Sequence, residues 1–176
     1  MKSRRSSRSA AFTLVELLIV ILILAIAAAI VVPNLGTAAD SQAVSAARVL
    51  ESDLELARSL ALMTQQTHSV VFSPDRQSYK VVANYGGGAY ATAVAVEHPV
   101  RAGARMETTL KKVGGMGAVV VADVSFGGAT HVTYVTFTSL GEASSAGSIT
   151  LQAGGTQMVI SVESLTGAVT VQRTAG

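Results

Sequence analysis

The N-terminal part of the chain contains a long apolar run. From Phe12 to Val32 there are 21 residues and a single charge, Glu16. A helix rises about 1.5 Å per residue, so this run would span about 30 Å, the hydrocarbon thickness of a bilayer. The run therefore predicts a transmembrane helix. A lone carboxylate costs roughly 2.5–3.5 kcal/mol at the centre of such a helix, so Glu16 needs an interaction that offsets this cost.

A second helical pattern, amphipathic in character, covers residues 34–66. Its polar residues predict a solvent-facing side, and Glu55 and Arg58 are spaced for an ion pair on the helix surface. Pro33 precedes this pattern and predicts a kink, because proline removes one backbone hydrogen bond of a helix. The apolar stripe recurs in steps of three or four at Leu35, Ala39, Ala43, Ala46, Leu50, Leu54, Ala57 and Ala61. The polar positions are Asp40, Gln42, Arg48, Glu51, Asp53, Glu55 and Arg58.

From about Thr67 onward the pattern changes to short alternating segments separated by turns, which is typical of β-strands. Ser73-Pro74-Asp75-Arg76 predicts a hairpin turn, and so does Gly154-Gly155. The predicted fold class is α+β, with a long N-terminal helix packed on an antiparallel β-sheet head. Strands are predicted at residues 68–73, 77–83, 92–97, 118–126, 131–137, 148–153, 157–162 and 168–173.

The charge distribution predicts which side of the membrane each end of the chain occupies. The formal net charge of +2 depends on four basic residues that precede the apolar run, and without them the chain has 9 basic and 11 acidic residues. Basic residues next to a membrane helix stay on the cytoplasmic side, so we expect a single pass through the inner membrane with the head outside the cytoplasm. The head itself does not have the composition of a basic nucleic-acid binder. The four basic residues are Lys2, Arg4, Arg5 and Arg8.

A secretory signal peptide is the alternative interpretation of the N-terminus. Ala25-Ile26-Ala27 resembles a cleavage site, and cleavage there would release a soluble β-domain. The apolar run continues past this point to Val32, whereas the region after a cleavage site normally turns polar. A retained anchor is therefore the favoured interpretation.

The segment "AFTLVELLIVILILAIAAAIVVPNL" resembles the N-terminus of type IV pilins and type II secretion pseudopilins. The resemblance implies that a prepilin peptidase cleaves between Ala11 and Phe12 and that the new amine of Phe12 is methylated. Members of this superfamily usually have glycine at the position of Ala11. In a filament, the Glu16 carboxylate of one subunit would pair with the Phe12 amine of its neighbour, and buried charges are tolerated when they are paired.

Three further motifs resemble the H-type (GspH) minor pseudopilins and the FimT-like minor pilins. They are Ala57-Arg58-Ser59, the turn from Phe137 to Gly141, and Thr166-Gly167. The resemblance implies a minor subunit whose partners are other pilins or pseudopilins, the prepilin peptidase and N-methyltransferase, and membrane lipid. The chain would divide into a cleaved leader (1–11), an assembly helix (12–33), the amphipathic helix (34–66) and a β-rich head (67–176).

No residue pattern predicts an enzyme, a cofactor or a metal site. The chain has no cysteine, and its three histidines, His68, His98 and His131, lack the spacing of metal ligands. The glycine-rich segments at 86–88 and 114–117 lack the lysine and hydroxyl of a phosphate loop. The sequence therefore predicts a structural subunit of a type II secretion pseudopilus or a type IV pilus.

One cluster of basic residues leaves open a role in DNA contact. Arg101, Arg105, Lys111 and Lys112 lie close together in sequence, opposed by Glu107. Such a cluster is usually a solvated surface, but in a minor pilin of a DNA-uptake pilus it would contact phosphates. The net acidity of the head favours the solvated surface.

The N-terminal pattern predicts a defined mature end. We expect the mature chain to begin at a methylated Phe12, without the four basic side chains of the leader. Mass spectrometry of the N-terminal peptide measures this directly. A mature chain that begins at Ala28 would instead establish the signal-peptide interpretation.

Overall fold

The computed structural model describes residues 13–31, 34–128 and 132–175. The chain divides into two compact units, the first ending at Leu35 and the second comprising Gly36–Gly176. The leader, the predicted cleavage site and Pro33 lie outside the described residues, so the predicted kink does too.

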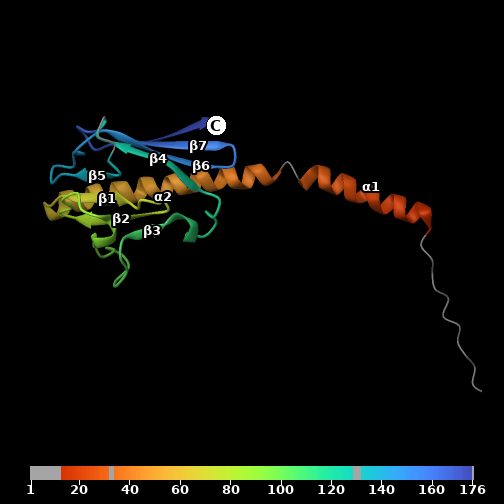
Figure 1. Ribbon diagram of the computed structural model, residues 1–176, viewed down its shortest axis with the longest axis horizontal. Helices are drawn as coiled ribbons and strands as arrows, with labels where there is room; N and C mark the ends of the chain where they lie inside the picture. Colours follow the sequence, from red (N-terminus) through yellow and green to blue (C-terminus); the bar gives the residue numbers. More distant parts are fainter. Residues whose placement is uncertain (1–12, 32–33, 129–131, 176) are drawn as a thin grey trace, which may run out of the picture. The chain divides into compact units, whose positions relative to one another are not determined.

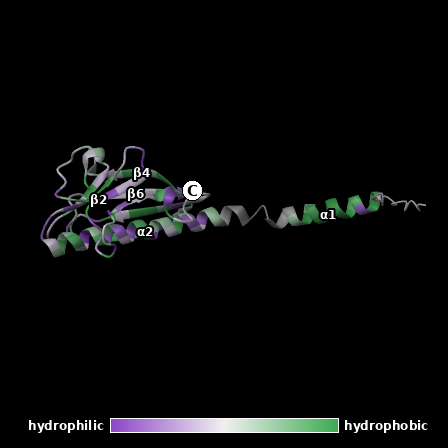
Figure 2. Ribbon diagram, turned by 90° about the horizontal axis from the view of Figure 1, so that it is seen from below, coloured by the Kyte–Doolittle hydropathy of each residue, from purple (hydrophilic) through white to green (hydrophobic). Residues whose placement is uncertain are grey.

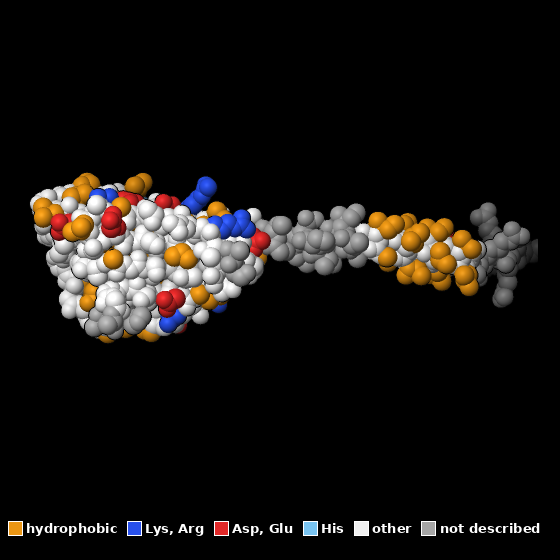
Figure 3. Space-filling model, turned by 90° about the horizontal axis from the view of Figure 1, so that it is seen from above, with side chains coloured by type: hydrophobic (Ala, Val, Ile, Leu, Met, Phe, Trp, Pro, Cys, Tyr) orange, Lys and Arg blue, Asp and Glu red, His pale blue; other side chains and the backbone are white. Residues whose placement is uncertain are grey.

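The first unit contains helix α1, Leu14–Val31. Its large apolar side chains between Leu14 and Ile26 are 47–78% exposed, on all sides of the helix. Figure 2 shows the described part of α1 coloured hydrophobic over most of its length, and Figure 3 shows hydrophobic side chains over much of the visible face of this part. A helix that is apolar all round requires an apolar environment.

The predicted transmembrane segment, Phe12 to Val32, begins and ends outside the described residues. Among the helices that the structure describes, none is both long enough and apolar enough to cross a membrane.

The second unit is built around helix α2, Asn34–Thr64, whose first two residues belong to the first unit. The predicted apolar stripe is confirmed from Ala43 onward, and Ala47, which was not among the predicted positions, is also buried. Ala39 is only half-buried. The fully buried residues of α2 are Ala43, Ala46, Ala47, Leu50, Leu54, Ala57 and Ala61.

Two four-stranded antiparallel sheets complete the second unit (Figure 1). One sheet has the order β3-β2-β1-β5 and the other β4-β6-β7-β8. The predicted α+β class with antiparallel strands is confirmed, although the head has two sheets. The strands are β1 (His68–Phe72), β2 (Ser78–Ala83), β3 (Glu107–Thr109), β4 (Val120–Phe126), β5 (Tyr134–Phe137), β6 (Gly147–Ala153), β7 (Thr156–Val162) and β8 (Val169–Ala175).

The predicted strand at 92–97 is wrong. A short 3₁₀ helix, Tyr90–Thr92, ends at the first residue of this segment, and only Val96 joins the sheet through its backbone. The Val96 N–H donates to Val81, and its carbonyl accepts from Met106, each at 2.8 Å. The edge of β2 is instead taken by β3, which is too short and polar to give an alternating pattern. The apolar alternation of 92–97 thus reflects a partly buried loop.

Both predicted hairpin turns are confirmed. The Arg76 N–H donates to the Ser73 carbonyl at 2.9 Å, and Asp75 accepts hydrogen bonds from the Gln77 N–H and the Ser73 hydroxyl. The hydrogen bond from Ser73 is the main cause that lowers the pKa of Asp75. Between β6 and β7, the turn at Gly154 closes on the pair Ala153 and Thr156.

The buried face of α2 and the inner faces of both sheets form one hydrophobic core. Tyr79, Phe72, Phe126 and Phe137 are its largest fully buried side chains. In β7 the inward positions alternate with half-buried ones, as expected for a strand with one face on a core. The core thus lies entirely within the second unit.

A fragment that starts at Asn34 is expected to fold by itself, because it contains the buried face of α2 and both sheets. It should be monomeric and β-rich, with a single cooperative transition in denaturant. In this fragment, Leu54→Ala should lower the free energy of unfolding by about 2–5 kcal/mol, because it leaves a cavity at a fully buried position. Leu165→Ala, at a side chain that is 78% exposed, is the matched control and should change it by less than about 0.5 kcal/mol. Aggregation or the lack of a cooperative transition would show that the unit boundary is wrong.

Candidate functional site

Arg58 connects the C-terminal part of α2 to two distant turns. Its Nε donates to the carbonyl oxygen of Gly141 at 3.1 Å, and its Nη1 lies 3.5 Å from Glu55 Oε2, which confirms the predicted ion pair. Gly167 packs against the same carbonyl, since a Cβ built there would overlap the Gly141 oxygen and lie 3.2 Å from Arg58 Nε. We call Arg58, Gly141 and Gly167 the Arg58 junction.

Both glycines of the Arg58 junction are needed for its geometry. Gly141 has φ +82° and Gly167 has φ +62°, a region that side chains rarely adopt. Both are buried. The three motifs that resemble H-type minor pseudopilins are far apart in sequence, and the Arg58 junction brings one residue of each into contact. The need to form this contact explains why an arginine and two glycines occupy these positions.

The opposite flank of α2 is attached to the first sheet through Asp53. Asp53 Oδ2 accepts hydrogen bonds from the Tyr79 hydroxyl at 2.6 Å and from Thr108 Oγ1 at 3.2 Å. Burial raises the pKa of Tyr79 well above its ordinary value, and the charge of Asp53 raises it further. The phenol therefore stays protonated and acts as a donor to the carboxylate.

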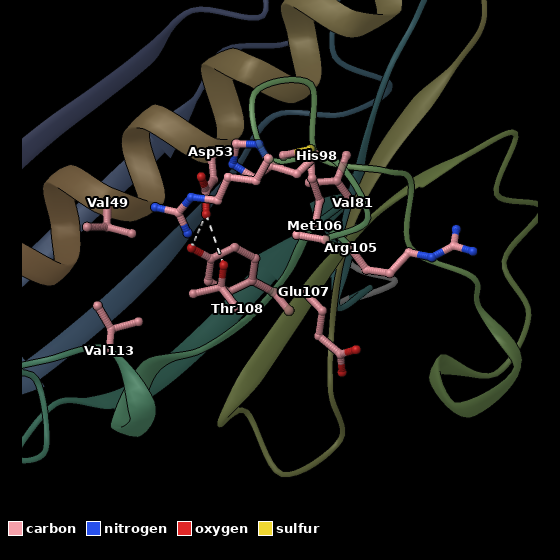
Figure 4. Close-up of a pocket in the computed structure, with 12 residues that line it drawn as sticks. Val49, Asp53, Val81, His98, Arg105, Met106, Glu107, Thr108 and Val113 are labelled. Atoms are coloured by element: carbon pink, nitrogen blue, oxygen red, sulfur yellow. Dashed lines mark hydrogen bonds between the residues drawn. The ribbon is translucent and has the colours of Figure 1, made fainter.

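A cleft of about 290 Å³ opens beside this contact. Figure 4 shows Asp53 directed toward Thr108, whereas Arg105 extends away from Asp53. His98 also lines the cleft, but its Nδ1 accepts the Val100 N–H at 3.1 Å. The hydrogen bonds of Tyr79 and Thr108 to Asp53, at the side of this cleft, hold the helix to the sheet.

The structure brings together three of the four basic residues of the predicted cluster. Arg101, Arg105 and Lys112 line one open hollow, whereas Lys111 lines another. Glu107 lies in the hollow with the first three. The cluster is therefore divided between two places and carries an acidic residue within it.

Arg105 is partly engaged within the protein. Its Nη1 donates to the carbonyl of Ala95 at 2.8 Å. Glu107 Oε1 in turn lies 3.8 Å from Lys80 Nζ. These contacts are typical of a solvated loop surface whose charged side chains bind other groups of the same protein. Fewer cations are therefore directed outward than the sequence alone suggests.

The histidines do not converge. His68 is buried in β1, with Nδ1 3.2 Å from the carbonyl of Gln66, while His98 lies in the loop before β3. His131 lies outside the described residues. Within residues 13–31, 34–128 and 132–175, no group of three or more His, Cys, Asp or Glu side chains could hold a metal ion.

Of the predicted N-terminal site residues, only Glu16 is described. It lies in the first turn of α1, where its N–H donates to Thr13, with the carbonyl oxygen at 3.1 Å and Oγ1 at 3.2 Å. This is the geometry of a threonine that caps the helix N-terminus. Ala11 and Phe12 lie outside the described residues.

Four of the polar residues of α2 that were predicted to face solvent, including Arg58 and Asp53, are half-buried and also bind other parts of the second unit. Asp40 Oδ1 accepts the Gly155 N–H at 3.2 Å, and Gln42 Oε1 accepts the Ala118 N–H at 3.1 Å. Helical spacing could have indicated that these four residues lie on the two flanks of α2 rather than on its outer side. Asp40 and Arg58 are about five turns apart and Gln42 and Asp53 about three, so each pair shares one flank of the helix.

Comparisons with known families place these features in context. The sequence profile of the family described as type II transport protein GspH matches residues 46–167. The profile of the prokaryotic N-terminal methylation motif matches residues 6–32. The first match includes the whole Arg58 junction, and the second includes Glu16. No curated protein matches the chain in sequence.

Solved structures of two proteins share the fold. The type IV minor pilin FimU of Pseudomonas aeruginosa PAO1 is 16% identical, with a TM-score of 0.53 over 75% of this chain and 89% of FimU. The minor pseudopilin EpsH of the Vibrio cholerae type II secretion system is 14% identical, with a TM-score of 0.56 over 78% of this chain and 96% of EpsH. The predicted pilin-like fold is therefore confirmed.

The Arg58 junction predicts an unusual sensitivity at Gly167. Gly167→Ala should lower the free energy of unfolding for two reasons. Alanine is strained at the left-handed φ of this position. In addition, the new Cβ displaces the Gly141 carbonyl, which should cost about 1–3 kcal/mol. Denaturant unfolding of the fragment from Asn34 measures this loss.

Gly128→Ala is the matched control. Gly128 has the same φ, +62°, but no heavy atom lies within 4 Å of its added Cβ. This variant should therefore show only the conformational part of the loss. Equal losses for the two variants would contradict the close approach at the Arg58 junction.

Proposed function

Since this chain belongs to the family of type II transport proteins GspH, and is therefore a pilin-type subunit, we propose that it is a processed minor subunit of a type II secretion pseudopilus or a type IV pilus. It would be cleaved between Ala11 and Phe12, methylated at Phe12, and assembled with other pilins or pseudopilins. The observation that carries this proposal is the N-terminal methylation motif at residues 6–32, followed by the all-apolar helix α1.

Glu16 is proposed to register the subunit during assembly. It is the only charged residue of α1, and the surrounding apolar side chains are exposed within the isolated chain. Cleavage would create a cationic amine at Phe12, with a reference pKa near 8. Pairing that amine with Glu16 of a neighbouring subunit would neutralise both charges, whereas a subunit out of register would leave two unpaired charges in an apolar bundle.

The proposed location follows from the charge distribution. The family with the methylation motif is one of membrane-anchored subunits. The four basic residues of the leader support a cytoplasmic N-terminus. The head would then lie on the periplasmic side of the inner membrane, where contacts with other subunits form. The profile match at residues 6–32 also favours this anchored form over a secreted soluble domain.

Glu16→Gln tests the assembly role, because glutamine keeps the size of the side chain and removes its charge. Incorporation of the full-length protein into sheared filaments, measured by immunoblot, should fall at least about tenfold, since the amine loses its counter-charge. Membrane insertion should be at least as efficient as in the wild type, because an intramembrane charge is removed. Cleavage after Ala11, measured by mass spectrometry, should be retained.

Glu142→Gln is the control for the loss of one charge, because Glu142 is an exposed residue of the second unit. It should be incorporated like the wild type. Normal incorporation of Glu16→Gln would contradict the registration role. Failure of the wild-type chain to enter filaments or to cross-link to other pilins would contradict the proposed function itself.

A further inference from the structure

Strand β8 forms the edge of the second sheet. Among the described residues it pairs only with β7, through seven consecutive residue pairs without a bulge. In Figure 1 it is the darkest blue strand, leading to the C-terminus at the margin of the sheet. An open edge of this kind presents a row of backbone N–H and C=O groups to a further strand.

The register shows which groups face outward. Hydrogen-bonded and non-hydrogen-bonded pairs alternate along an antiparallel ladder. The Glu163 N–H donates to the Ala168 carbonyl at 3.0 Å, so Ala168 is directed toward β7. Every second residue after it, namely Thr170, Gln172 and Thr174, shares that direction. The N–H and C=O groups of Val169, Val171, Arg173 and Ala175 therefore face the open edge.

The other outer edges of the two sheets are protected, as edges of natural sheets usually are. β3 has only three residues. The outer side of β5 is covered where the Thr136 carbonyl accepts the Ser144 N–H at 2.8 Å. β4 has a register shift between Val121 and Asp123, and Arg76 Nη1 donates to its Ala122 carbonyl at 2.5 Å.

The β8 edge is less protected: the strand has seven residues, its ladder to β7 has no register shift, and Arg173 is its only charged residue. It contains no proline or lysine. Its one charged side chain, Arg173, donates to Thr156 Oγ1 at 2.8 Å on the face toward α2. Val169 and Val171 pack against the core but are only partly buried. A strand added beside them would cover their open side with apolar side chains.

The direction of β8 limits which strand can be added. The turn before β7 contacts Asp40 near the start of α2, and the turn after β7 contacts Arg58 near the end of α2. β7 therefore runs along α2 in the same direction, and β8 runs in the opposite direction. A neighbouring head anchored by the same N-terminal end can therefore pair antiparallel with β8 only through a strand that runs away from its anchor.

We propose that the β8 edge binds an edge strand of another pilin-type subunit by β-strand addition, which rests on the proposed function. Backbone hydrogen bonds to Val169, Val171, Arg173 and Ala175 fix the pairing, and alternate apolar side chains of the partner strand pack beside Val169 and Val171. The interaction joins heads side by side and is separate from the pairing of Glu16.

A proline at an outward-facing position tests this pairing. Val171→Pro removes one outward N–H and leaves the ladder to β7 intact, because edge strands tolerate proline where the N–H faces away from the sheet. Val171→Ala is the matched control, since it also loses the valine side chain but keeps the N–H. We expect the full-length Val171→Pro protein to be incorporated into sheared filaments at least about tenfold less than Val171→Ala.

Protease resistance of the head in both variants establishes that the proline has not unfolded it. If Val171→Pro loses this resistance, an Arg173→Pro and Arg173→Ala pair gives the same comparison at the next outward-facing position. Equal incorporation of a folded proline variant and its alanine control would overturn the proposal while leaving the proposed function intact. If the wild type is not incorporated at all, the proposed function fails.

A photo-cross-linking amino acid at Gln172, on the exposed outer face of β8, identifies the occupant in the full-length chain. The expected product is a covalent link to a strand peptide of a pilin-type subunit, identified by mass spectrometry and lost in the Val171→Pro background. The same probe at Gln152 of the interior strand β6 is the control and should not give this product. A link to any other class of protein, or the same product from Gln152, would overturn the proposal.

Discussion

The second unit depends on the burial of one face of α2. Both sheets contribute their inner faces to the same core, and α2 supplies the residues that they share. The buried positions of the helix are mostly alanine, with Leu50 and Leu54 as the larger side chains. Small residues let the backbones approach closely, so the two sheets can both reach a single helix. Without this face, each sheet would have an exposed apolar surface of its own.

The polar contacts on the two flanks of α2 fix how the helix lies in that core. Hydrophobic packing alone tolerates rotation and sliding, because it is not directional. On one flank Arg58 donates a hydrogen bond and Asp40 accepts one, and on the other flank Gln42 and Asp53 accept hydrogen bonds; together they select one orientation. The match to the family profile includes most of these residues and the whole Arg58 junction. The motifs that resemble the family therefore have a physical role in this chain, which is to orient α2.

Local patterns predicted much of this fold, and long-range contacts account for what they missed. Helical periodicity identified the buried stripe of α2, and alternation identified seven of the eight strands, because both patterns reflect burial on one face. Alternation failed at 92–97, where a loop is partly buried, and at the short β3. The partners of Arg58 and Asp53 could not be read from the sequence, since Gly141 and Tyr79 are distant in it. Hydrophobic patterning likewise gives no information on whether the edge of β8 is covered.

The wide sequence separation within the Arg58 junction has a consequence for the order of folding. Arg58 and Gly141 are 83 positions apart, and the second contact, at Gly167, comes later still. Contacts between distant residues form slowly, because the loop that they close must first lose its entropy. As the chain is synthesised from its N-terminus, α2 is complete long before either glycine exists. The helix that organises the head is therefore complete while the second sheet, which covers part of its apolar face, is still being made, and the apolar surface exposed in this interval favours aggregation of the nascent chain.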